Sequence, residues 1–269
     1  MWLAAKRLRA ALVGEQLLRG ELRHPELSTI DLAGRTVTAV ASIGKHLLTR
    51  FDDGTSLHTH FMMDGSWHLY AAGSRWQGPD HQVRAVLAVP GRVAVGYRLH
   101  GMKLVPTAQE SRLLGHLGPD LLAADWGSEL AAEAARRLAA QPDRELGQAL
   151  LDQRLLAGVG NVYKNEVCFL LGVSPWAPVS AVDPLQCVSL CRDLLLVNAD
   201  RPQQSTTGAL GQGLQHWVFE RTGQPCRRCG TTIGTAMQGP GAHARTSYLC
   251  PHCQPGFHPA LRTAGRRRV

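Results

Sequence analysis

Four cysteines near the C-terminus constrain the fold of this 269-residue chain more than any other feature of its sequence. They form two pairs, Cys226-x2-Cys229 and Cys250-x2-Cys253, with twenty residues between the pairs. Each Cys-x-x-Cys pair favours a tight turn that directs two thiolates toward one point, and two such turns complete a tetrahedral metal site. Because four thiolates leave no position open for water, we expect one structural Zn²⁺. An iron–sulfur cluster or redox-active pairs are the alternatives.

The residues between the two cysteine pairs predict a short β-ribbon. The segments "TTI" and "TSYL" are suited to strands, and a glycine-rich stretch separates them. Arg245 stands at the end of that stretch. A rigid ribbon that presents an arginine suits contact with a phosphate or insertion into a DNA groove.

The first 125 residues predict a different architecture, in which one helix precedes antiparallel β structure. Apolar residues at helical spacing predict a helix over residues 1–19. Alternating segments follow, with tight-turn signals at Asp52–Gly54 and Pro90–Gly91. We therefore expect residues 1–125 to form a β-sandwich domain.

The sequence after residue 125 predicts helices. A helix is expected to begin at Ser128 as its cap, and "LLAGVGNVYKNEV" predicts two helices joined by turns, with Asn161 capping the second. Turns that meet at a helix N-terminus present free amides that bind phosphate, although the same residues often serve turn geometry alone. The whole chain is therefore predicted to be an α+β multidomain protein. Its predicted parts after the sandwich are a helical domain (126–215), a four-cysteine zinc finger (216–254) and a basic disordered tail (255–269).

The charge of the chain limits its class of partner. Lysines and arginines outnumber acidic residues by 29 to 21, which gives a net charge of +8. A basic protein suggests a polyanionic partner, most simply nucleic acid, although a generic basic surface is the alternative. The sequence has no run of 18 apolar residues and no signal-peptide pattern, so we expect no membrane partner.

Together these pieces resemble the formamidopyrimidine-DNA glycosylase and endonuclease VIII family. The resemblance rests on the sandwich, "LGPD", "LLDQRLLAGVGNVYKNE", "VFERTGQPCRRCG" and "ARTSYLCPHCQ", and it covers nearly the whole chain. It implies a bifunctional enzyme of base-excision repair that removes oxidised bases and then cleaves the backbone as an apurinic/apyrimidinic lyase by β,δ-elimination. It also implies damaged DNA as the partner of a monomeric, cytoplasmic, nucleoid-associated protein. The modest segment 200–215 favours oxidised pyrimidines, because purine-specific members carry a longer loop there.

The start of the chain departs from the family pattern. Family members begin Met-Pro-Glu, and after removal of the methionine the proline amine attacks the deoxyribose C1′ while the glutamate handles protons. Here Met1 aligns inside the family's first helix, just ahead of Trp2, and no capping residue precedes it. We expect the natural start to lie upstream. The alternative is a variant without the nucleophile, a non-enzymatic zinc-ribbon DNA-binding protein.

The resemblance assigns roles to three polar residues. Lys45, in "SIGKHLL", matches the hairpin lysine that contacts DNA beside the lesion and acts as a proton donor, and we expect it to be catalytic. Asn161 matches the DNA-binding asparagine of the helix–two-turns–helix. Arg245 matches the zinc-finger arginine that grips phosphate and assists δ-elimination, so we expect both catalytic and DNA-binding roles for it.

Three further residues are expected to contact DNA. Met62 and Met63 lie in "HFMMDG", which matches the loop that fills the gap left by an everted nucleotide. An apolar wedge lowers the cost of that gap, whereas packing in the core is the alternative role for these methionines. His116, in "GHLGPD", stands where family members often carry a DNA-contacting arginine.

Overall fold

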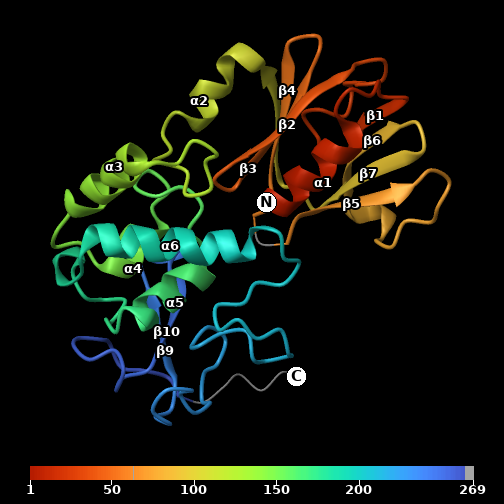
Figure 1. Cartoon of the computed structure of the whole chain (residues 1–269). Helices are drawn as coiled ribbons and strands as arrows, with labels where there is room; N and C mark the ends of the chain where they lie inside the picture. The colour runs from red at the N-terminus through yellow and green to blue at the C-terminus, as the bar shows by residue number, and fades with distance from the viewer. Residues whose placement is uncertain (63, 264–269) are drawn as a thin grey trace. The chain divides into compact units, whose positions relative to one another are not determined.

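The computed structural model describes residues 1–62 and 64–263, so Met63 and residues 264–269 lie outside the described residues. The chain divides into two compact units, an N-terminal unit of residues 1–116 and a C-terminal unit of residues 117–269 (Figure 1). Each unit has its own buried hydrophobic core. No helix in the described ranges is long and apolar enough to cross a membrane.

The N-terminal unit is a sandwich of two four-stranded antiparallel sheets, as the sequence predicts. One sheet has the order β1-β6-β7-β5, and its strands are Arg19–Leu22 (β1), Val83–Val89 (β6), Arg92–Tyr97 (β7) and Ser66–Ala71 (β5). The other has the order β2-β3-β4-β8, and its strands are Val37–Ile43 (β2), His46–Phe51 (β3), Thr55–His60 (β4) and Gly101–Pro106 (β8). The predicted turns at Asp52–Gly54 and Pro90–Gly91 join β3 to β4 and β6 to β7, so both hairpins are confirmed.

The first helix, α1 (Trp2–Leu12), packs one apolar face into the core of the sandwich, against β2 and β5. It is shorter than the sequence predicts, because Val13 is extended and Gly14 takes a φ of +86°. Beyond it, Leu17 is buried and Leu18 is exposed, which is the alternation of a strand and not of a helix. The prediction of a helix to residue 19 is therefore wrong, and Arg19 begins β1.

The N-terminal unit also contains short helical segments. After β8 come a single 3₁₀ turn (Thr107–Gln109) and α2 (Glu110–Leu114), and a further 3₁₀ turn (Asp80–Gln82) precedes β6. Glu110 ties α2 to the second sheet, because its carboxylate accepts hydrogen bonds from Arg50 at 2.9 and 2.7 Å and from the Ser56 hydroxyl at 2.6 Å.

The C-terminal unit is helical with a terminal β-ribbon. Its helices are α3 (Ser128–Ala139), α4 (Leu146–Leu151), α5 (Asn161–Leu170) and α6 (Pro184–Ala199), with 3₁₀ turns at Val179–Ala181 and Gly241–His243. Its ribbon consists of β9 (Gly234–Gln238) and β10 (Arg245–Leu249), which pair antiparallel. The helices enclose one apolar core, and a smaller cluster that includes Phe169 and Ile233 lies against the cysteines.

Two helix starts differ by one residue from the prediction. Gly127 and Gly160 occupy the N-cap positions of α3 and α5, so Ser128 and Asn161 are the first helical residues. Gly160 is extended there, with φ −116° and ψ −177°. The Asn161 side chain is therefore free of the capping role and is used elsewhere.

The first strand of the ribbon also differs from the prediction. The residues "TTI" precede β9 instead of forming it, because their backbone closes the turn of the first cysteine pair. The amide of Cys226 donates to the carbonyl of Thr231 at 2.8 Å, and the amide of Ile233 donates to that of Gln224 at 2.9 Å.

Residues 255–263 are ordered against the ribbon, which corrects the prediction of a disordered tail for that part. Thr235 of β9 and Arg262 exchange two backbone hydrogen bonds of 2.9 and 2.8 Å, and the Ser174 hydroxyl donates to the carbonyl of Phe257 at 2.7 Å. The pair of bonds between Thr235 and Arg262 forms one antiparallel bridge beside β9. Residues 264–269 of the predicted tail lie outside the described residues.

Candidate functional site

The four cysteines form a cluster with the geometry of a tetrahedral metal site. Their sulfur atoms all lie within 4.8 Å of one another, and in the part of the chain that the structure describes they are the one such group. The Sγ atoms of Cys226 and Cys253 are 3.9 Å apart, and those of Cys229 and Cys250 are 3.4 Å apart. A tetrahedron of zinc–sulfur bonds has edges of about 3.8 Å. The residues present therefore fit a single thiolate-bound ion.

Backbone amides support two of these sulfurs. The amides of Arg228 and Cys253 point at the sulfurs of Cys226 and Cys250, each at 3.4 Å. Burial raises the pKa of the Cys250 thiol, so a bound cation is what would hold this group as a thiolate.

Helix α5 binds the ribbon through three polar side chains. Asn161 donates from Nδ2 to the carbonyl of Thr246 at 3.1 Å, and Lys164 donates from Nζ to the Ser247 hydroxyl at 2.6 Å. The Oδ1 atom of Asn165 accepts the amide of Tyr248 at 2.7 Å. These three bonds hold three consecutive residues of the ribbon, Thr246, Ser247 and Tyr248. The structure thus brings Asn161 beside the strand that Arg245 begins, and Arg245 itself is exposed.

Lys164, Asn165 and Glu166 are buried polar residues beside Asn161 that the sequence analysis did not single out. All three are fully buried, and burial lowers the pKa of Lys164 to about 8. Glu166 accepts hydrogen bonds from the amides of Trp217, Val218 and Phe219 at 2.8 to 2.9 Å, and also from the Thr206 hydroxyl. The sequence does contain a signal for these contacts, namely three successive polar residues inside an otherwise apolar helix. Buried polar groups require hydrogen-bond partners, so such a run predicts contacts with another segment.

In the N-terminal unit, Lys45 lies half-buried in the turn between β2 and β3. Beside it lies a set of four imidazole rings, here called the histidine cluster: His46, His58, His60 and His116. The centroid of the His46 ring is 5.0 Å from that of His58, 5.1 Å from that of His60 and 6.5 Å from that of His116. The strand register explains the first three members, since His46 lies directly opposite His60 and His58 is two residues away on the same face of β4.

Three members of the histidine cluster, His46, His58 and His60, have lowered pKa values. Burial, together with repulsion from neighbouring charged groups, lowers the pKa of His46 and of His58 to about 4 each. Burial also lowers the pKa of His60, with Lys45 as a second cause. These three rings therefore act as hydrogen-bonding groups and not as cations near pH 7.

The loop that follows His60 exposes Met62. This residue has a left-handed backbone, with φ +51°, and its side chain is 61% exposed. Arg98 anchors the loop by donating from Nε to the carbonyl of Asp64 at 3.0 Å. Gly65 is required at the end of the loop, because a Cβ there would lie 2.7 Å from the carbonyl oxygen of Phe61. Met63, the second predicted wedge residue, lies outside the described residues.

The predicted site residues thus fall into two sets. The set in the N-terminal unit consists of Lys45, Met62 and His116, which gather around the histidine cluster. The set in the C-terminal unit consists of Asn161, Arg245 and the four cysteines, which gather at the ribbon.

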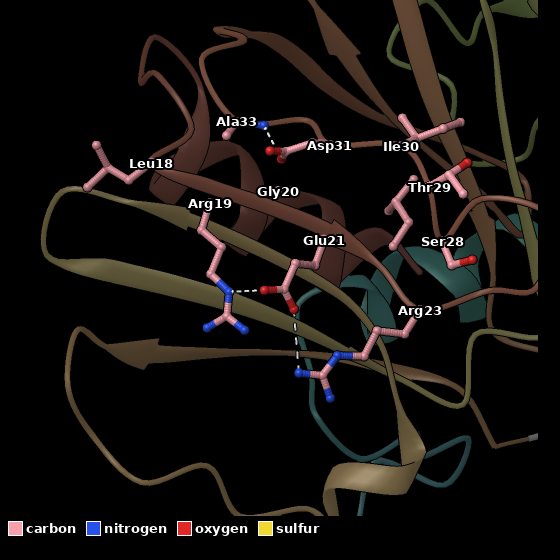
Figure 2. A pocket seen from close by; sticks show the side chains of 11 residues that line it. Leu18, Arg19, Gly20, Glu21, Arg23, Ser28, Thr29, Ile30, Asp31 and Ala33 are labelled. Carbon is pink, nitrogen blue, oxygen red and sulfur yellow. Dashed lines mark hydrogen bonds and ion pairs between the residues drawn. The ribbon is translucent and has the colours of Figure 1, made fainter.

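A further cavity, of about 470 Å³, lies against strand β1 of the N-terminal unit (Figure 2). Glu21 stands between Arg19 and Arg23 at its wall and pairs with them at 2.5 and 3.4 Å (Figure 2). None of the predicted site residues lines it. These ion pairs are largely solvated, so they contribute little to stability and give the cavity no reactive group.

Two family models match the chain. The model described as the formamidopyrimidine-DNA glycosylase N-terminal domain matches residues 2–118. The model described as the formamidopyrimidine-DNA glycosylase H2TH domain matches residues 117–200.

Named relatives and solved structures are similar over nearly the whole chain. "Probable endonuclease 8 2" of Streptomyces coelicolor is 50% identical, and the match covers 100% of this chain and 96% of that protein. "DNA-(apurinic or apyrimidinic site) lyase Nei2" of Mycolicibacterium smegmatis is 45% identical, covering 93% and 95%. A crystal structure of Lactococcus lactis Fpg (MutM) with DNA containing N7-benzyl-Fapy-dG has a TM-score of 0.76 at 21% identity and covers 95% and 98%, so the fold is shared.

Proposed function

This chain belongs to the formamidopyrimidine-DNA glycosylase and endonuclease VIII family, and on that premise we propose that it is a base-excision repair enzyme acting on damaged DNA. It is a DNA glycosylase with apurinic/apyrimidinic lyase activity, as its endonuclease 8 and lyase relatives are named. It removes oxidised bases and then cleaves the backbone by β,δ-elimination. The alternative of a DNA-binding protein without catalysis has no support in these relatives.

The main structural support for this function is the set of hydrogen bonds between α5 and the ribbon. The amide group of Asn161 has two hydrogens, and the carbonyl of Thr246 takes only one of them. The N-terminus of α5 adds backbone amides that have no carbonyl partner within the helix. With the exposed guanidinium of Arg245 on the neighbouring strand, these donors favour binding of DNA backbone phosphates.

The cysteine cluster would hold one Zn²⁺ through the sulfurs of Cys226, Cys229, Cys250 and Cys253. A closed shell of four thiolates gives the ion a structural role, because no position is open for water or substrate. Its contribution is to fix the two turns that carry β9 and β10, and so to fix Arg245. No chemical step on DNA passes through the ion.

The N-terminal unit would supply the groups that act beside the lesion. Lys45 contacts the DNA there and donates a proton, and Met62 enters the gap left by the everted nucleotide. The exposed, left-handed Met62 supports this role, because strained loops with exposed apolar tips are typical of such contacts. His116 contributes a DNA contact next to His46.

Oxidised pyrimidines are the substrate class we favour. Residues 200–215 contain no helix or strand in the described chain, and they form a short segment between α6 and the ribbon. Such a segment covers less of an everted base than the longer loop of purine-specific members. The chain is proposed to work as a monomer on chromosomal DNA in the cytoplasm.

The test is cleavage of defined duplexes. Protein with an in-frame Met-Pro-Glu start is incubated with duplexes that contain thymine glycol, 8-oxoguanine or an abasic site. We expect strand cleavage that leaves phosphate at both ends of the gap, with thymine glycol and abasic sites preferred. Binding of all three duplexes without any cleavage would instead support the non-enzymatic alternative.

A further inference from the structure

The backbone fixes which ring nitrogen of His60 carries a proton. The amide of Met62 donates to Nδ1 of His60 at 2.8 Å. A ring nitrogen that accepts a hydrogen bond is unprotonated, so neutral His60 carries its hydrogen on Nε2.

The contact between His46 and His58 fixes the tautomers of both rings. Nδ1 of His46 and Nε2 of His58 are 2.8 Å apart, so one hydrogen lies between them. Nδ1 of His58 is buried and has no hydrogen-bond partner among the described residues. If His46 were the donor, neutral His58 would carry its hydrogen on that Nδ1 and bury an unpaired N–H, which is rarer and costlier than an unpaired acceptor. His58 is therefore the donor, and His46 carries its own hydrogen on Nε2.

The resulting donor lies where DNA is expected. His46 is the residue after Lys45, its ring is half-buried, and it lies directly opposite His60 in the sheet. We propose that His46 is a further DNA-contacting residue, which donates its Nε2 hydrogen to a backbone phosphate beside Lys45, and that buried His58 is its positioning residue. This inference rests on the proposed function, since it concerns how the same protein holds damaged DNA.

The neutral state of His46 gives the contact a distinctive signature. His46 is uncharged near pH 7, because burial and its cationic neighbours lower its pKa to about 4. A neutral donor strengthens binding without releasing a counterion from the DNA, whereas each lysine or arginine contact on a phosphate releases about one. Loss of His46 therefore weakens binding without changing its dependence on salt, and loss of Lys45 changes both.

The first experiment measures binding of full-length protein to a duplex with a tetrahydrofuran abasic analogue, near neutral pH and over a series of salt concentrations. We expect His46→Phe to bind roughly tenfold more weakly, with an unchanged salt slope. His46→Gln should regain most of this loss, because its carboxamide nitrogen donates from near the Nε2 position. His81→Phe, an exposed histidine of the same unit, is the control and should bind as the wild type does.

Two outcomes would overturn the role of His46. One is His46→Phe with unchanged affinity, and the other is an affinity loss whose salt slope falls by a whole charge, which would make His46 a cation. The wild-type titration separates this inference from the proposed function. If the wild type itself fails to bind the duplex, the proposed function fails. If the wild type and His46→Phe bind equally well, only the inference fails.

The second experiment tests His58 through the tautomers. Long-range ¹H–¹⁵N correlation spectra of ¹⁵N-histidine protein identify the protonated nitrogen of each ring. We expect Nε2 to be protonated in His46, His58 and His60. His58→Phe should let His46 populate both tautomers and should weaken binding about threefold, whereas His58→Gln, which keeps an N–H donor, should restore both. A His46 ring protonated on Nδ1 in the wild type, or a binding loss in His58→Phe without any change at His46, would refute the positioning role.

Discussion

The four-cysteine cluster and the histidine cluster each gather four ligating side chains, one in each unit of the molecule. The cysteine sulfurs lie within 4.8 Å of one another and converge on a single point. Three of the histidine rings lie on strands β3 and β4 and His116 joins them from beyond α2, with centroids 5.0 to 6.5 Å from that of His46. The first arrangement encloses an ion, whereas the second presents hydrogen-bond donors side by side.

The difference between the two clusters lies in what each does for the fold. Strands β3 and β4 are held by a four-stranded sheet and a buried core, so their histidines are placed by structure that is already stable. The ribbon has only two strands, and a two-stranded ribbon is marginal in water without further support. We therefore expect changes at the cysteines to act on folding and changes at the histidines to act on ligand binding.

The largest effect is expected from removal of one zinc ligand. Cys229→Ser should release the metal and unfold the ribbon, because a structural zinc site contributes roughly 10 kcal/mol or more to folding. Elemental analysis should find one zinc per wild-type chain and none in the variant. Hydrogen exchange should show loss of protection in β9 and β10 but not in β3 and β4. The control is Cys187→Ala, which changes a buried cysteine outside the cluster. A full complement of iron in the wild type would contradict this prediction.

The second prediction concerns the chemistry that the N-terminal unit carries. Borohydride traps a Schiff base between protein and abasic DNA as a stable adduct. We expect trapping by a chain extended upstream to Met-Pro-Glu and none by the chain that starts at Met1, because the Met1 amine lies several residues from the position of the family's proline and an ordinary lysine is almost wholly protonated near neutral pH. Both chains should bind abasic duplexes through phosphate contacts.

The trapping experiment can also identify another amine of the chain as the nucleophile. Burial lowers the pKa of the Met1 amine, so a larger fraction of it is neutral near pH 7 than of an ordinary N-terminus. Efficient trapping by the chain that starts at Met1 would therefore contradict the prediction and point to this amine or to Lys45. Lys45→Ala in the same chain identifies which of the two forms the adduct. The absence of trapping by either chain would favour the binding-only alternative.

The third prediction tests the grip of the C-terminal unit on phosphate. Arg245→Ala should weaken binding to all duplexes alike and lower the salt slope by about one, because one phosphate contact is lost. In the cleavage assay it should also reduce δ-elimination more than base excision. Arg136→Ala, which removes an exposed arginine of α3, is the control. Unchanged binding and an unchanged product distribution would show that the role assigned to Arg245 is wrong.

The cysteine cluster could be predicted from the sequence because its geometry is local. Each pair of ligands is three residues apart, so the turn alone directs both sulfurs. The hairpin turns were equally local. The predicted helix over residues 1–19 extends beyond the observed one. Leu17 and Leu18 continue the helical spacing of apolar residues, but the left-handed Gly14 has already ended the helix.

The histidine cluster was missed although part of its signal was present. The spacing of His58 and His60 places them on one face of a strand, and a hairpin centred on Asp52–Gly54 brings His46 opposite His60. Combining the turn with the strand period would have found these three residues. His116 joins them from far along the chain, as Trp217–Phe219 join Glu166, and no local pattern encodes such contacts.

The smallest effect is expected from lowering the pH, which should act on the histidine cluster and the cysteine cluster for different reasons. The pKa of His58 is lowered to about 4 by burial, with Lys103 and His60 as like-charged neighbours and Glu110 as the opposing charge. His46 titrates near the same value, facing His58, His60, His116 and Lys45. The unfolded chain takes up these protons first, at its ordinary pKa of about 6.5. The stability that the neutral rings contribute is therefore full above that pH and is lost as pH falls through about 4.

Hydrogen exchange of β3 and β4 should report this loss, and His58→Gln should make it shallower because one titrating ring is gone. The ribbon is also expected to lose protection in acid, but for another reason, since protons compete with the metal for the thiolates. Added zinc should therefore protect β9 and β10 by mass action and leave β3 and β4 unchanged. If zinc protected β3 and β4 as well, the histidine cluster would be a metal site, and the contrast between an enclosed ion and an open row of donors would be wrong.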